Sequence, residues 1–99
     1  MLNAFLGWAK RVQSNCAGKS VRARISKREQ AGNPSARIDL ETPLALARIT
    51  FWQSRDFVAE IVTRDTAETL YLKCGQLDQG QDPAAPFAPF IQALGVGLK

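Results

Sequence analysis

Four short runs between residues 35 and 75 constrain the fold of this chain more than any other feature. In ARIDLE at 36–41 apolar and polar side chains alternate, and in FVAEIV at 57–62 one alternate set is wholly apolar while the other contains a glutamate. The runs are rich in β-branched and aromatic residues and are separated by turn-forming residues, a pattern typical of consecutive antiparallel strands. The sequence therefore predicts an antiparallel meander in the middle of the chain.

A fifth strand and two helices are predicted around these runs. Residues 21–26 alternate in the same way, and apolar residues recur every three or four positions in 2–16 and again from residue 87. Gly18 is the expected left-handed residue after the first helix, and Pro86 and Pro89 restrict the second helix to a start near Phe87. The predicted fold is α+β: one domain over residues 1–99, in which a five-stranded antiparallel meander carries both terminal helices on one face.

The strand register follows from the requirement that each apolar set shares one face, because a slip of one residue would turn every side chain over. The predicted pairs are Phe51 with Phe57, Ile49 with Ala59, Ile61 with Leu70 and Ala59 with Leu72. This register places Leu70, Leu72 and Cys74 on the helix-covered face, and Tyr71 on the opposite, outer face.

The outer face is predicted to carry arginines and aromatic residues. One row across the strands reads Arg24, Arg37, Arg48, Glu60 and Tyr71, so that three adjacent arginines repel one another beside a single acid. Arg22 is expected opposite Asp39 in the next row. Arg, Trp and Tyr dominate protein-binding hot spots, and an exposed apolar patch usually has a partner. The predicted partner-binding residues are Arg22, Arg24, Arg37, Arg48, Trp52, Glu60 and Tyr71.

Two other interpretations of this face stay open. The charges could simply be solvated and form cross-strand ion pairs, such as Arg48 with Glu60, each contributing about 0.2–1 kcal/mol. A second copy of the chain could also cover the face. Otherwise the chain is expected as a monomer or as a heterodimer with its partner.

A nucleic acid is the alternative partner. The net charge is +4, and the first 28 residues contain seven basic and no acidic side chains. Arginines beside Trp52 and Tyr71 could follow phosphates and stack on bases. Acidic residues such as Asp39 and Glu60 interrupt the surface, however, and no glycine–aromatic RNA-binding motif is present. A small nucleic-acid-binding module therefore ranks below a protein-binding one.

The residue types also limit the chemistry. The chain has no histidine, which removes the commonest general base and the commonest metal ligand. It has no phosphate-binding glycine loop and no cysteine spacing typical of a metal site. No catalytic, cofactor-binding or metal-binding residue is predicted, and the chain is not expected to be an enzyme.

The expected compartment is the cytoplasm. The apolar run at residues 2–9 is interrupted by Asn3 and Gly7, and its basic residues follow it, unlike a secretory signal. No run approaches the roughly 20 apolar residues of a membrane span. Cys16 and Cys74 are expected to be buried, reduced thiols, with a structural disulfide as the weaker alternative.

Several segments resemble one known family. They are FLGW at 5–8, NPSARIDLE at 33–41, ARITFW at 47–52, and EIV at 60–62 leading into DTAETL at 65–70. In these segments the chain resembles the TriTu-type immunity proteins, over about residues 5–94. The family pattern often has Ser-Gly after the tryptophan, where this chain has Ser54 and Arg55.

The resemblance implies a definite function. Such proteins are encoded beside Rhs-type polymorphic toxins that a type VI secretion system delivers between bacteria. The toxin domain is an ADP-ribosyltransferase that modifies elongation factor Tu and stops translation. The immunity protein binds the toxin in the cytoplasm and blocks it, without cofactor or catalytic activity of its own.

Overall fold

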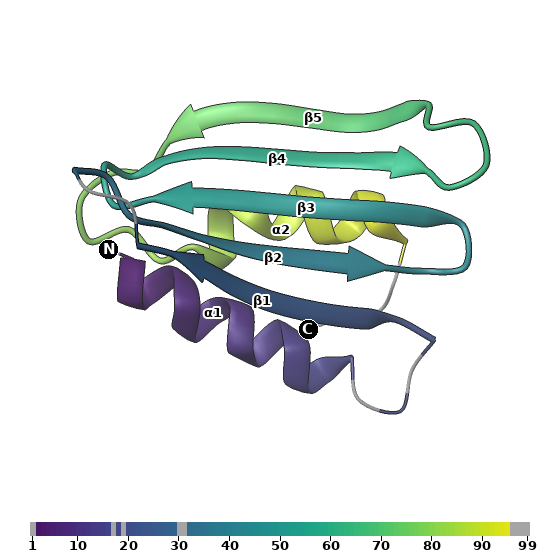
Figure 1. Cartoon of the computed structure of the whole chain (residues 1–99), viewed down its shortest axis with the longest axis horizontal. Coiled ribbons are helices and arrows are strands. Elements are labelled where there is room, and N and C mark those ends of the chain that lie inside the picture. The colour runs from purple at the N-terminus through teal and green to yellow at the C-terminus, as the bar shows by residue number, and fades with distance from the viewer. Residues whose placement is uncertain (1, 17, 19, 30–31, 96–99) are drawn as a thin grey trace.

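The fold is α+β, as predicted. The computed structural model describes residues 2–16, 18, 20–29 and 32–95. The elements in chain order are α1 (Leu2–Asn15), β1 (Arg22–Arg28), β2 (Ser35–Glu41), β3 (Ala45–Trp52), β4 (Asp56–Thr63), β5 (Thr69–Gln76) and α2 (Ala84–Leu94). Each strand is antiparallel to the next and lies beside it, so the sheet order equals the chain order (Figure 1).

Both helices cover the same face of the sheet. α1 contacts β1, β2 and β3, and α2 contacts β4 and β5. Figure 1 shows the two helices on one side, with the other side of the strands bare. This arrangement follows from the sequence, because a helix with one apolar stripe is stable only where another element buries that stripe.

A cluster of aromatic rings joins the helices to the sheet. Phe5 of α1 stacks on Phe51 of β3 with ring centroids 5.0 Å apart, and Phe87 of α2 forms a T-shaped contact with Phe57 at 5.1 Å. Phe5 and Phe87 also contact each other across the two helices at 6.0 Å. Aromatic pairs at these separations add to the free energy gained by burying the rings. The first and last elements of the chain therefore share one core.

The second helix begins earlier than predicted. It starts at Ala84 instead of near Phe87, so Pro89 lies inside the helix and not in its first turn. Pro83, with φ −61°, already has helical geometry at the N-cap, and the Asp82 carboxylate accepts the Ala84 N–H at 3.0 Å. These two residues start the helix before the predicted position. The predicted left-handed residue after α1 is confirmed, since Gly18 has φ 78°.

The register between β3 and β4 is as predicted, whereas the pairing of β2 is shifted by two residues. Phe51 lies opposite Phe57, and Arg48 lies opposite Glu60. Arg48 is also opposite Asp39, however, and not opposite Arg37 as predicted. The shift arises at the β2–β3 turn, where the Thr42 N–H donates to the Ala45 carbonyl at 2.9 Å and extends the ladder.

The same shift moves the partners of β1. Arg24 lies opposite Asp39 and Arg22 opposite Glu41, instead of opposite Arg37 and Asp39. The predicted row of three adjacent arginines is therefore wrong, because a carboxylate stands between Arg24 and Arg48.

The side chains of β5 lie on the opposite faces of the sheet from those predicted, although the strand runs in the predicted direction. Ile61 pairs with Tyr71 and Ala59 with Lys73, and the register shifts between Ile61 and Val62. A bulge of this kind adds one residue to a strand and turns the following side chains over. Leu70, Leu72 and Cys74 consequently lie exposed on the outer face.

Tyr71 lies on the helix-covered face, with its ring 5.9 Å from that of Phe90, so its predicted place on the outer face is wrong. The physical reason is space. Gly75 lies over the Phe57 ring, where a Cβ atom would come within 3.1 Å of the ring. The prediction that both thiols are buried is also wrong: Cys16 is buried and Cys74 is exposed, and neither forms a disulfide within the described residues.

Candidate partner-binding face

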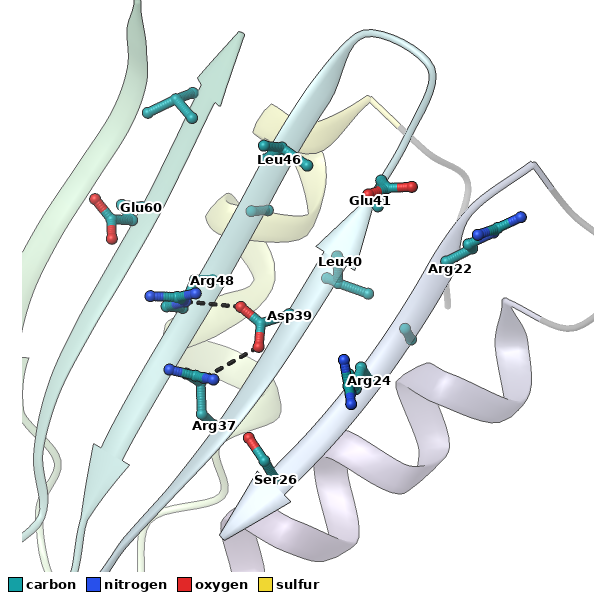
Figure 2. Close-up of a pocket in the computed structure, with 13 residues that line it drawn as sticks. Arg22, Arg24, Ser26, Arg37, Asp39, Leu40, Glu41, Leu46, Arg48 and Glu60 are labelled. Atoms are coloured by element: carbon teal, nitrogen blue, oxygen red, sulfur yellow. Dashed lines mark hydrogen bonds and ion pairs between the residues drawn. The ribbon is translucent and has the colours of Figure 1, made fainter. Parts of the chain in front are cut away.

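The bare face of the sheet is hollowed over β1, β2 and β3. The groove has a volume of about 1070 Å³. Figure 2 shows its walls, formed by side chains of four neighbouring strands. The charged residues that line it are Arg22, Arg24, Arg37, Asp39, Glu41, Arg48 and Glu60. We call this hollow the arginine groove.

Asp39 organises the charges of the arginine groove. Its Oδ1 accepts a hydrogen bond from Arg48 Nε at 2.7 Å, and its Oδ2 lies 3.0 Å from Arg37 Nε. Figure 2 shows the carboxylate between the two guanidinium groups. One acid thus holds two arginines that would otherwise repel each other. The side chains of both arginines stay more than 40% exposed, so both remain accessible to a partner.

The contact between Arg37 and Asp39 is an ion pair without an aligned hydrogen bond. The Arg37 Nε atom is itself buried and has no hydrogen-bond acceptor in the described part of the chain. A buried donor without an acceptor is costly, and that cost is recovered when an acceptor arrives.

Arg22 and Arg24 have no carboxylate partner among the described residues, since the ion pairs there involve Arg37, Arg48 and Arg64. Both side chains are exposed on β1, at one wall of the groove. Glu41, which lies opposite Arg22 in the register, is instead 3.5 Å from Arg64 Nη1. The β1 wall therefore carries two positive charges that no described carboxylate neutralises.

The outer face changes character beyond β3. Leu46 and Val62 line the groove at this side, and Leu72 follows on β5, opposite Glu60. Leu46 and Leu72 are 41% and 62% exposed. The face thus combines an arginine-rich half with an aliphatic half, a composition found at protein interfaces with an apolar centre and a charged rim.

The structure brings together five of the seven predicted site residues. Arg22, Arg24, Arg37, Arg48 and Glu60 all line the arginine groove. Trp52 does not line it, and lies half-buried at the far end of β3, opposite Ser35 of β2. The seventh residue, Tyr71, belongs to the core face. Whether the five bind a partner stays a prediction.

Sequence reasoning missed the central role of Asp39 and the outward position of Leu72. Asp39 was expected opposite Arg22, where it would form a single surface pair. Its true partners depend on the geometry of the turn after Glu41, which the sequence alone does not show. Leu72 was missed because the bulge leaves no clear mark in the sequence.

The described residues form neither a metal-binding cluster nor a helix that could span a membrane. No group of three or more acidic, cysteine or histidine side chains is arranged to hold a metal ion in the described part of the chain. Neither described helix has the length and apolar character that crossing a membrane requires.

Comparison with known families gives one match. The chain matches the family described as "Immunity protein TriTu" over residues 3–93, which is nearly its whole length. The chain therefore belongs to the TriTu immunity protein family. No curated protein matches it.

Proposed function

We propose that this member of the TriTu immunity protein family binds a toxin domain encoded beside it and blocks the toxin by direct contact. The observation that carries the proposal is the family match over residues 3–93. Immunity proteins neutralise toxins, and members of such families are typically not enzymes. The proposed partner is an ADP-ribosyltransferase delivered by an Rhs-type, type VI secretion system, and its target is elongation factor Tu. The proposed place of action is the cytoplasm.

The arginine groove is the proposed contact surface. Arg22 and Arg24 have no described carboxylate partner, and the exposed side chains of Arg37 and Arg48 share the single carboxylate of Asp39. Opposite charge on a partner speeds diffusional encounter and fixes the orientation of the complex. An acidic toxin surface, such as a cleft with a catalytic glutamate, fits these groups.

A nucleic acid fits the groove less well. Asp39, Glu41 and Glu60 lie among its four arginines, so the groove is only weakly positive and its acids would face the phosphates. An oligonucleotide of mixed sequence should therefore not bind, even at low ionic strength, where electrostatic binding is strongest. Tight binding that weakens steeply with added salt would favour the nucleic acid instead.

The decisive experiment is co-expression with the neighbouring toxin domain, followed by co-purification and an ADP-ribosylation assay on elongation factor Tu. The proposal expects rescued growth, a stoichiometric complex and loss of transferase activity. A chain that elutes alone while the toxin stays active would overturn the proposal.

Charge reversal then tests the groove. The double variant Arg22→Glu with Arg24→Glu breaks no ion pair among the described residues, and like charges facing each other should weaken toxin affinity about 100-fold. The matched control is Lys10→Glu with Arg11→Glu, which makes the same charge change on the exposed side of α1. Equal affinities of the two double variants would place the toxin elsewhere.

A further inference from the structure

The two edges of the sheet differ in charge. β1 carries four basic residues in seven, which are Arg22, Arg24, Lys27 and Arg28. β5 has a single charge, Lys73, and it presents Leu70, Leu72 and Cys74 on its outer side. Basic side chains on an edge strand prevent it from pairing with another strand, whereas an exposed, apolar edge invites pairing. Only β5 is therefore suited to extend the sheet.

The backbone of β5 is prepared for such pairing. The Leu77 N–H donates to the Arg55 carbonyl at 3.0 Å, which shows which residues of β5 direct their backbone groups toward β4. Along an antiparallel strand, residues that bond to the neighbouring strand alternate with residues that face away from it. Leu72, Cys74 and Gln76 therefore direct their backbone groups away from β4. The same residues whose side chains are exposed on the outer face thus carry the unpaired N–H and carbonyl groups of the edge.

A second copy of β5 is complementary to the first. Antiparallel pairing about a two-fold axis at Leu72 places Leu72 opposite its own copy and Leu70 opposite Cys74. Lys73 then lies opposite Tyr71 and not opposite the other Lys73. The register covers the middle of β5, which runs from Thr69 to Gln76. The equivalent pairing of β1 about its middle residue would set Arg22 against Arg28, and like charges directly opposite each other are destabilising.

We propose that two copies of this chain associate through β5 about a two-fold axis at Leu72, and join their five-stranded sheets into one. In this dimer the helices of both copies cover the same side of the sheet. Both arginine grooves stay exposed on the other side, at its two ends. The proposal concerns a surface separate from the arginine groove and does not depend on the proposed toxin.

The first test is the mass of the purified chain by sedimentation equilibrium over a series from nanomolar to high micromolar concentration. The wild-type chain should convert from monomer to dimer as its concentration rises. Leu72→Lys should raise the dimer dissociation constant about 100-fold, because two lysines would face each other across the axis. The matched control is Leu44→Lys, at a leucine that is 81% exposed in the β2–β3 turn and should leave the dissociation constant unchanged.

A crosslinking experiment tests the register. In a Cys74→Ser background, Leu72→Cys should give a disulfide-linked dimer under mild oxidation, since residues opposite each other in such a pair have Cα atoms about 5.5 Å apart. Thr69→Cys in the same background should not crosslink, because the proposed register places it opposite Gly75.

Three outcomes would overturn the proposal. They are a wild-type chain that stays monomeric at the highest concentration, a dimer that Leu72→Lys does not weaken, and equal crosslinking of the two cysteine variants. A monomeric chain whose Leu72→Lys variant binds toxin more weakly would assign the β5 edge to a strand of the toxin instead.

Discussion

The two faces of the sheet are held together by different forces. On the helix-covered face, Phe5, Phe51 and Phe87 are almost completely buried and interact through ring contacts that water does not reach. On the outer face, Asp39 links two partly exposed arginines that compete with water and salt. Exposed ion pairs contribute little to stability, whereas buried rings contribute most of it. Changes on the first face should therefore alter folding, and changes on the second should mainly alter binding.

The largest expected effect is that of Phe5→Ala on the buried face. Phe5 is fully buried and contacts the rings of Trp8, Phe51 and Phe87. Its truncation leaves a cavity between α1 and the sheet and should lower the free energy of unfolding by about 3–5 kcal/mol, measured by urea denaturation. The control Leu44→Ala, at an exposed leucine, should change it by less than about 0.5 kcal/mol. Similar losses in both variants would contradict the assignment of stability to one face.

The second effect concerns the edge of that face. Gly75→Ala should lower the free energy of unfolding by about 1 kcal/mol, because the new Cβ would lie 3.1 Å from the Phe57 ring, and that ring is buried against Phe87 and cannot move freely. Cys74→Ala, one residue away on the exposed side, is the control and should have little effect. Thermal unfolding of both variants checks this. An unchanged Gly75→Ala variant would mean that Tyr71 and Gly75 do not face the core.

A smaller effect is expected for Asp39→Ala on the outer face. Its removal leaves Arg37 and Arg48 close together without their shared carboxylate, and should lower the free energy of unfolding by about 0.5–1 kcal/mol at low salt. High salt should reduce the loss, because it screens the repulsion between the arginines. Glu60→Ala is the control, since Glu60 is in no ion pair among the described residues. A loss that does not depend on salt would argue against an electrostatic role of Asp39.

The smallest effect should come from a residue on neither face. Ala67 lies in the turn between β4 and β5 with φ 56°, a left-handed conformation that costs free energy for any residue with a Cβ atom. Ala67→Gly should therefore raise the free energy of unfolding by about 0.5 kcal/mol, after the greater chain entropy of glycine is included. Chemical denaturation of the variant checks this, and an Ala67→Gly variant that is less stable than the wild-type chain would contradict the expected relief of backbone strain.

The sequence predicts the number, order and direction of the strands because alternation and turn residues determine them locally. It also predicts the pairing of Phe51 with Phe57, since a short turn leaves little freedom between β3 and β4. Alternation cannot detect a shift of two residues, because such a shift keeps every side chain on its face. For this reason the pairing of Arg48 with Asp39 emerges only from the hydrogen bonds of the Thr42 turn.

The orientation of β5 could not be predicted for a different reason. The pattern of Leu70, Leu72 and Cys74 favours their burial, but the bulge near Ile61 turns these side chains to the outer face. What decides the orientation is the space over Phe57, which accepts Gly75, and the position of Phe90, which receives Tyr71. Both depend on where α2 lies against the sheet. The composition of the arginine groove was therefore largely predictable, whereas its ion pairs and its aliphatic border were not.

The meander has a consequence for the order in which the chain folds. Every strand pairs with its neighbour in the sequence, so each hairpin can form as soon as its second strand has been synthesised. The ring contacts of Phe87 with Phe5 and Phe57 join α2 to α1 and to β4, so they must wait for the last helix of the chain. During translation the sheet can thus assemble strand by strand, while the aromatic core closes only when α2 leaves the ribosome.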